Sequence, residues 1–287
     1  MNSPCRLGVS LKPPSVLIAL GAAALLLLPG GAIAQEGDTE SLTLMLSSND
    51  GLRAQGMDYI IQQIDYFRQD GSRASVRLYQ ADFGWVPGDA RRGATDGSLE
   101  LLFDAPNGSA DGLPASAIGN AVSRAGATWG ADTCLADAPL TEVTHPGGDV
   151  TVFDGVAAEG TIGDPFAGDI VVAGFPGSVE SLFGPDTIAF SVTFIFIDGA
   201  GVPTDMDADG RLDTAHNEVY LNPAMDWTLD PEQGTGFDLE TTALHELGHS
   251  LGLGHFGAPP ASVMNPVYAG VRRELFAIDH AALCILY

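Results

Sequence analysis

The pattern H-E-x-x-H-x-x-G-x-x-H, at residues 245–255, constrains the fold of this chain more than any other feature. Histidines at positions i and i+4 of a helix project from one face, so His245 and His249 can reach the same metal ion. His255 reaches that point only if the helix ends and the chain turns back. Gly252 permits this turn, because glycine adopts left-handed backbone angles at little cost. The pattern therefore predicts a helix, a turn and a shared metal site.

Three neutral imidazoles beside a carboxylate are the donor set of a catalytic zinc site. Three nitrogens leave a tetrahedral zinc ion one open position, which a structural site lacks. Glu246 follows the first histidine and can take a proton from a zinc-activated water. A bare H-E-x-x-H also occurs by chance, as two surface histidines on an amphipathic helix. The added glycine and third histidine favour the metal site, with His245, His249 and His255 as ligands.

These residues resemble the active-site signature of the metzincin clan of zinc endopeptidases. Residues 261–268, A-S-V-M-N-P-V-Y, resemble the Met-turn of that clan, in the Met-x-Pro-x-Tyr form of the matrixins (matrix metalloproteinase-like enzymes). The segments 236–244 and 279–287 resemble the start of the matrixin active-site helix and the last helix of the family. Phe256 departs from the serine usual in vertebrate matrixins, which leaves the subfamily open.

The resemblance implies an α+β fold with a metzincin, zincin-like catalytic domain. Such a domain has a twisted mixed sheet, a long backing helix and an active-site helix. It implies a zinc-dependent endopeptidase that hydrolyses extended protein or peptide substrates, with Glu246 as general base. Met264 would support the zinc ligands from beneath, and Tyr268 would line the site. The alternatives are another metzincin subfamily with a narrow substrate, or a calcium-binding extracellular structural or adhesive protein with an inactive metzincin-like site.

Residues 1–34 have the composition of an export signal. Arg6 and Lys12 precede an apolar run at residues 16–28, and residues 32–34 form a small-x-small cleavage site. The run is too short to cross a membrane comfortably, since about 20 residues are needed. The sequence therefore predicts a bacterial protein, secreted or periplasmic after signal-peptide cleavage, that is soluble and monomeric.

Charge excludes several partners. The chain has 37 acidic against 12 basic residues, a net charge of −25 at pH 7. A surface of this sign repels nucleic acid and anionic lipid, so neither is expected to bind. The hydrophobic fraction of 45% is nevertheless sufficient for a packed core.

Two cysteines, Cys134 and Cys284, remain once Cys5 leaves with the signal. In an exported chain they are expected to form a disulfide. The competing role, a cysteine that blocks the zinc in a latent matrixin, is disfavoured because the Pro-Arg-Cys-Gly motif is absent. Cys134 also lies inside the expected catalytic domain.

A second metal site is indicated at residues 205–213, where D-x-D-x-D-G places carboxylates around a glycine turn. The glutamate expected at position twelve of an EF-hand is replaced by His216, so the loop is not a full EF-hand. The alternative is an acidic surface turn. The histidines outside the zinc pattern lack the spacing of a second, structural zinc. The candidate calcium ligands are Asp205, Asp207, Asp209 and Asp213.

The expected organisation is a signal peptide (1–34), an N-terminal extension or propeptide-like β-rich segment (35–106) and the catalytic domain (107–287). The middle segment could also be an integral part of the catalytic sheet. The zinc helix is expected to start at Asp238, which can cap it. Residues 57–67 fit a helix or a strand. Apolar periodicity predicts a helix at 116–131 and strands at 75–83, 101–103, 141–153, 169–175, 188–197 and 218–221.

Overall fold

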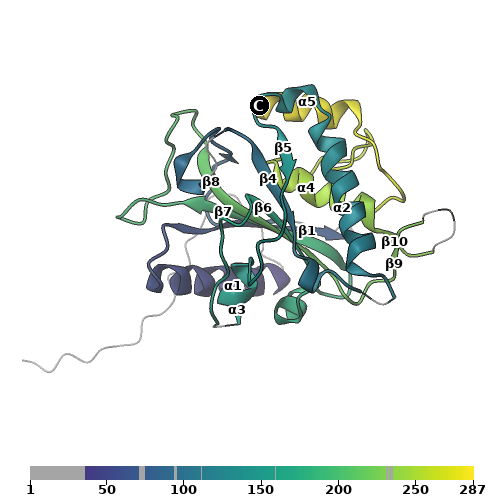
Figure 1. Ribbon diagram of the computed structural model, residues 1–287, viewed down its shortest axis with the longest axis horizontal. Helices are drawn as coiled ribbons and strands as arrows, with labels where there is room; N and C mark the ends of the chain where they lie inside the picture. The colour runs from purple at the N-terminus through teal and green to yellow at the C-terminus, as the bar shows by residue number, and fades with distance from the viewer. Residues whose placement is uncertain are drawn as a thin grey trace, which may run out of the picture. The chain divides into compact units, whose positions relative to one another are not determined.

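A mixed β-sheet divides the helices of this chain into two groups (Figure 1). The structure, a computed structural model, describes residues 36–287 except 71–74, 94–95, 111, 159, 231 and 233–234. The expected signal peptide lies outside the described residues, so its cleavage stays a prediction. Gln35–Tyr287 forms one compact unit.

The sheet has the strand order β2-β1-β7-β8-β6-β4-β5, with β3 pairing separately with β8. β8, β6, β4 and β5 run parallel to one another. β7 runs antiparallel to β8, and β1 runs antiparallel to β7. Every residue of β7 is buried, which explains its near-continuous apolar sequence. β9 (Trp227–Thr228) and β10 (Phe237–Asp238) form a separate pair. The sheet strands are β1 (Tyr59–Arg68), β2 (Ser75–Arg77), β3 (Phe83–Gly84), β4 (Leu99–Phe103), β5 (Leu140–Glu142), β6 (Ile170–Gly174), β7 (Thr187–Phe196) and β8 (Leu212–Leu221).

Helices cover both faces of the sheet. α2 (Ala115–Gly130), α4 (Leu239–Ser250) and α5 (Ala277–Leu286) share one apolar cluster with β4, β6 and β8, centred on Trp129. α1 (Glu36–Ala54) and α3 (Phe153–Ala157) pack in a second cluster on the opposite face, where Figure 1 shows them below the sheet. Short 3₁₀ turns are η1 (Ala90–Arg92), η2 (Ala105–Asn107), η3 (Thr133–Leu135) and η4 (Gly177–Leu182). The α+β fold implied by the resemblance is thus confirmed.

The segment 35–106 contributes β1, β2, β3 and β4 to this sheet. Of the alternatives for this segment, the structure shows the one in which it is an integral part of the sheet. β1 pairs along its whole length with β7, so the segment is not a separate lobe in the structure. The division at residue 106, and any removal of the segment, stay predictions.

The strand expected at 141–153 is wrong. β5 ends at Glu142 and α3 begins at Phe153, with irregular chain between them. Gly147 and Gly148 have φ angles of 91° and 85°, in the left-handed region that interrupts a strand. The short strand expected at 218–221 is the end of the longer β8. The earlier part of β8 was not predicted, because several of its buried residues are polar and break the apolar pattern. No described helix combines the length and apolar character needed to cross a membrane.

Candidate active site

The helix α4 carries the first two histidines and is fixed at its start by Asp238. The Asp238 carboxylate accepts hydrogen bonds from the backbone N–H and hydroxyl of Thr241, the first at 2.8 Å. This is an N-cap, which satisfies a donor that the first helical turn leaves free. Arg273 forms an ion pair with the same carboxylate, and the Tyr268 hydroxyl accepts a hydrogen bond from the Asp238 backbone at 2.9 Å. Every residue of α4 is buried, so packing on all sides fixes the orientation of the helix and of the two histidines that it carries.

Gly252 makes the turn that the third histidine needs. Its φ of 93° is left-handed, and its N–H bonds to the His249 carbonyl at 2.9 Å. The N–H of Leu253 bonds back to the Gly248 carbonyl, also at 2.9 Å. This double closure is a Schellman-type helix end, which reverses the chain and returns His255 to the helix.

The three imidazoles converge on one point. Their Nε2 atoms lie 3.2 Å (His245–His255), 3.2 Å (His249–His245) and 3.1 Å (His249–His255) apart. In a tetrahedral site with Zn–N bonds of about 2.0–2.1 Å, neighbouring nitrogens lie about 3.3 Å apart. The spacing of these atoms therefore fits a single zinc ion.

Backbone carbonyls fix which nitrogen carries the proton in two of the rings. His245 Nδ1 lies 2.7 Å from the Val263 carbonyl, and His249 Nδ1 lies 2.7 Å from the Leu253 carbonyl. A carbonyl only accepts, so each Nδ1 donates and each Nε2 presents a lone pair to the shared point. Lone pairs facing one another this closely repel unless a cation lies between them.

Burial also keeps these rings neutral. Desolvation lowers the pKa of His249 to about 4 and, with the charge of His249, lowers the pKa of His255 to about 3. The pKa of His245 is held well below its usual range, first by burial and then by its two histidine neighbours. Neutral imidazole is the form that binds metal, so the set is ready for a cation at neutral pH.

Glu246 is the unusual carboxylate of this site. It is fully buried, and among the described residues no group lies in full hydrogen-bond geometry to either of its oxygens, although the Ser191 hydroxyl is near enough to act on its pKa. Burial raises its pKa well above the usual range, and the nearby carboxylate of Asp65 raises it further. A buried carboxylate in this setting is costly for folding alone, which points to a chemical use.

The segment after the third histidine packs under the helix. Met264 is fully buried, and a Cβ added at Gly248 would overlap its sulfur, so the two elements are in direct contact. Asp279 holds this segment by accepting hydrogen bonds from the Ser262 hydroxyl and the Val263 backbone. The histidine rings and the Met-turn are therefore one packed unit.

Sequence reasoning missed two residues close to the histidines. The Phe67 ring stacks on His245 with 3.9 Å between centroids, and an Asp65 oxygen lies 4.0 Å from His249 Nδ1. Both residues come from β1, which the sequence reading assigned to an N-terminal extension. No local motif marks them, because the pairing that brings them here joins distant parts of the chain.

The loop 205–213 gathers only part of its expected set. Oxygens of Asp205, Asp207 and Asp213 lie within 4.8 Å of one another, whereas Asp209 lies outside this group. Asp213 is buried and forms an ion pair with Arg91 at 2.6 Å, so one of the clustered charges already has a partner. The repulsion that favoured calcium is thereby smaller than the sequence alone indicates.

Cys134 and Cys284 are joined by a disulfide, which ties η3 to α5.

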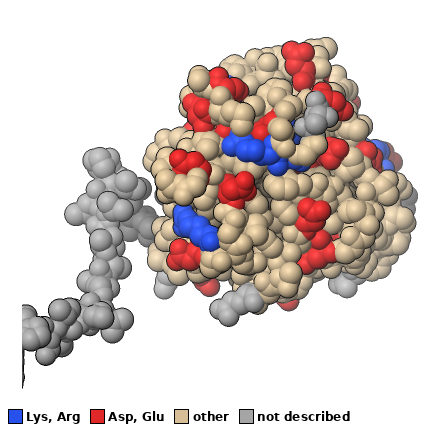
Figure 2. All heavy atoms as spheres, turned by 60° about the vertical axis from the view of Figure 1, so that its left-hand side comes forward, with Lys and Arg blue, Asp and Glu red and all other residues tan. Residues whose placement is uncertain are grey.

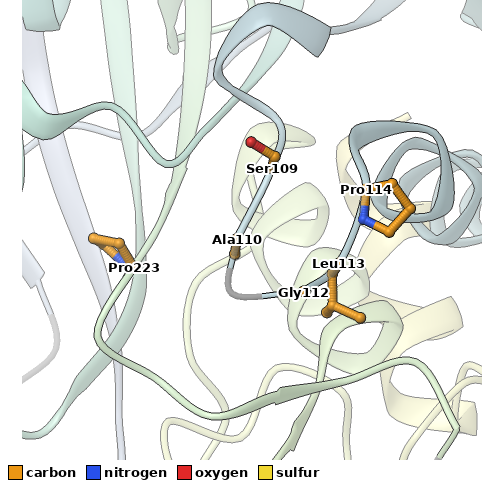
Figure 3. Close-up of a pocket in the computed structure, with 6 residues that line it drawn as sticks. All are labelled: Ser109, Ala110, Gly112, Leu113, Pro114 and Pro223. Carbon is orange, nitrogen blue, oxygen red and sulfur yellow. The ribbon is translucent and has the colours of Figure 1, made fainter.

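The hollow in Figure 3 is a separate feature between the start of α2 and the chain after β8, and its lining includes none of the three histidines. Figure 2 shows acidic side chains spread over the visible face, with few basic ones among them.

The ion pair at the helix start predicts a pH-dependent stability. Burial acts to raise the pKa of Asp238, but hydrogen bonds from Arg273 and Thr241 hold it below its usual range. The stabilisation is present above the unfolded pKa of about 4 and is lost as the pH falls through the folded value. We expect Asp238→Asn, which keeps a capping oxygen, to cost about 1.5–3 kcal/mol at neutral pH and less near pH 3. Urea unfolding at both pH values measures this, and an equal cost at both would contradict the assignment.

The fold and the site together are those of a zinc-peptidase-like α+β domain. Residues 206–287 match the Matrixin family. The chain is 52% identical to human matrix metalloproteinase-25 over 53 residues, 18% of this chain and 9% of that protein. It is 40% identical to karilysin of Tannerella forsythia over 69 residues (24% and 14%), and 48% identical to rat matrilysin over 64 residues (21% and 23%).

The family match lies in the C-terminal part of the chain. The matches to the three relatives span less than a quarter of the length of each of those proteins. They support a matrixin-like metallopeptidase and indicate a metalloendopeptidase for this part of the chain.

Proposed function

We propose that this protein is a zinc-dependent endopeptidase whose metal is held by His245, His249 and His255. The observation that carries the proposal is the convergence of three Nε2 atoms, 3.1–3.2 Å apart, next in the helix to the buried carboxylate of Glu246. When bound, zinc supplies Lewis acidity, which polarises the scissile carbonyl and activates water for attack.

Glu246 is the general base in this proposal. Its carboxylate follows the first histidine in α4 and is buried beside the three rings, where it can take the proton of the attacking water and pass it to the leaving amine. The Val263 and Leu253 carbonyls keep the rings of His245 and His249 oriented while this happens. Met264 and Asp279 hold the segment from which the Val263 carbonyl comes.

The substrate proposed is an extended protein or peptide that pairs through its backbone with a sheet edge beside α4. The export signal favours a protein that works outside the cytoplasm, and we propose that it acts as a monomer. The net charge of −25 disfavours nucleic acid and anionic lipid as partners.

The proposal is tested by casein hydrolysis with and without a zinc chelator. Hydrolysis that the chelator stops and added zinc restores supports the peptidase. Hydrolysis that continues unchanged in the chelator, or a protein that binds zinc but cleaves neither casein nor a peptide library, would favour the alternative of an inactive binding protein.

Calcium is a second proposed cofactor, with a structural role in the 205–213 loop. Asp205 and Asp207 are its exposed candidate ligands, together with Asp213 and, by the sequence pattern, Asp209. Calcium should raise the melting temperature of the protein, and Asp205→Asn combined with Asp207→Asn should remove that increase. An increase that persists in the double variant would rule out this loop as the source.

A further inference from the structure

We infer that the chain has a second zinc site around the Cys134–Cys284 disulfide, which forms when that disulfide is reduced. Its ligands come in two pairs, one from the start of η3 and one from α5: Asp132 and Cys134, with His280 and Cys284. The inference goes beyond the proposed function, since none of these residues takes part in peptide hydrolysis. Three observations carry it: the convergence of four donors, the chemistry of those donors, and packing that holds η3 and α5 in place without the disulfide.

The four donors lie close together. One ligand atom from each of the four residues lies within 4.8 Å of the other three. His280 Nδ1 lies 2.8 Å from Oδ2 of Asp132, 4.0 Å from Sγ of Cys134 and 3.9 Å from Sγ of Cys284. In a tetrahedral zinc site, a nitrogen ligand lies about 3.4 Å from an oxygen ligand and about 3.6 Å from a sulfur ligand. Side-chain rotations, without movement of the backbone, are therefore sufficient to complete the tetrahedron.

Local structure aims each pair at the other. His280 and Cys284 are four residues apart on α5, so they project from one face of the helix. Asp132 is the N-cap of η3, where its Oδ1 accepts a hydrogen bond from the Cys134 N–H at 2.9 Å. Its Oδ2 is left to face His280. In the oxidised protein a proton on His280 Nδ1 joins the ring to this oxygen, and the inferred ion takes the place of that proton.

The donor set exceeds what a disulfide needs. Two thiolates, an imidazole and a carboxylate are the ligand types that zinc takes in proteins. Four protein ligands leave no open position, so this ion would connect η3 to α5 and not act on a substrate. The set contains one histidine, and its cysteines are 150 residues apart, so histidine spacing in the sequence does not mark it. The plain alternative, a surface ion pair between His280 and Asp132, predicts no gain of metal on reduction.

Packing holds the two elements in place without the S–S bond. Leu135 of η3 and Leu283 of α5 are buried in the apolar cluster around Trp129. At the end of α5, the Tyr287 hydroxyl donates a hydrogen bond to the Leu251 carbonyl at 3.2 Å. The donors on η3 and α5 therefore stay near one another once the cysteines are reduced.

The change of state requires a dithiol as reductant. The dithiol gives two electrons and two protons to the Cys134–Cys284 bond and becomes a disulfide itself, which leaves two cysteine thiols. Zinc then displaces the two thiol protons to water as the thiolates bind. The S–S bond connects η3 to α5 in one redox state, and the zinc ion connects them in the other.

The experiment counts zinc in the full-length protein, oxidised and reduced. Reduction uses a water-soluble phosphine, which leaves no thiol to compete for metal, and zinc is present throughout so that the reduced protein is never without it. After gel filtration, the reduced protein should hold one zinc ion more per chain than the oxidised protein. Co²⁺ in place of zinc should give thiolate-to-metal charge-transfer absorption in the reduced protein only. An equal metal content in the two states would overturn the inference.

Variants of the reduced protein test the two ligands that are not cysteines. Asp132→Asn keeps the capping oxygen, and His280→Ala removes the ring. Each should weaken binding of the extra zinc by at least about 10–100-fold, the loss typical of replacing a residue that only supports a metal ligand. His145→Ala is the matched control, because His145 also faces a carboxylate, Asp104 at 3.1 Å, but lies outside the cluster. Unchanged affinity in the first two variants, or an equal loss in the control, would overturn the four-ligand site.

A cysteine-free form completes the test. Cys134→Ser combined with Cys284→Ser should hold the same amount of zinc with and without the phosphine, and an extra ion that persists in it would overturn the inference. Because the readout is a difference between two redox states, it does not depend on the histidines of α4. An extra ion on reduction, with none in the oxidised protein, would support the inference and refute the proposed peptidase centre. One ion in both states would do the reverse.

Discussion

Glu246→Gln is expected to lower peptide hydrolysis by about 10²–10⁴-fold, the usual contribution of a general base. The amide keeps the shape of the side chain but cannot take a proton from water at neutral pH. The change is measured as kcat/KM for a fluorogenic peptide, with the zinc-loaded wild type and variant compared side by side.

Zinc content is the control for this variant. Glu246 is not one of the three convergent ligands, so Glu246→Gln should bind as much zinc as the wild type. Loss of hydrolysis with zinc retained assigns a proton-transfer role to the carboxylate. Retained hydrolysis in the variant would remove Glu246 from the mechanism.

Trp129→Ala is expected to destabilise the protein by about 3–5 kcal/mol, as for other large aromatic residues removed from a core. Trp129 is fully buried between α2 and α4, and its indole N–H bonds to the Leu244 carbonyl at 2.8 Å. Its ring also lies against Gly248, on the helix turn between the first two histidines. The substitution should therefore weaken zinc binding along with stability, both of which denaturant unfolding at fixed zinc would detect.

Ile285→Ala is the comparison for this loss of apolar volume. Ile285 lies on α5 and is 75% exposed, so its removal should change the unfolding free energy by no more than about 0.5 kcal/mol. A similar cost for both substitutions would mean that the cluster around Trp129 does not hold α4 in place.

The sequence could predict the zinc helix and its turn because all the information is local. The spacing of His245 and His249 follows from the helical repeat, Gly252 supplies the reversal, and Asp238 supplies the cap. The helix at 116–131 was predictable for the same reason, since its apolar face repeats along a short stretch.

The position of Phe67 and Asp65 beside the histidines could not be predicted, because strand pairing joins residues far apart in sequence. β1 meets β7 across more than a hundred residues, and nothing within β1 itself names that partner. His216 shows the same limit, because no local pattern in the sequence predicts its environment. It is fully buried in β8, where its Nε2 lies 3.1 Å from Oε1 of Glu218. The same oxygen accepts a hydrogen bond from the Val152 N–H, and the second carboxylate oxygen accepts one from the Phe153 N–H.

The most direct test of the central claim is the zinc content and zinc position of the protein. Anomalous X-ray scattering from zinc-loaded crystals should show one ion bonded to Nε2 of His245, His249 and His255 at about 2.0–2.1 Å. His249→Ala should lose that ion while keeping the Cys134–Cys284 disulfide. An ion bound elsewhere, or a wild-type protein with no zinc among these rings at saturating metal, would contradict the account.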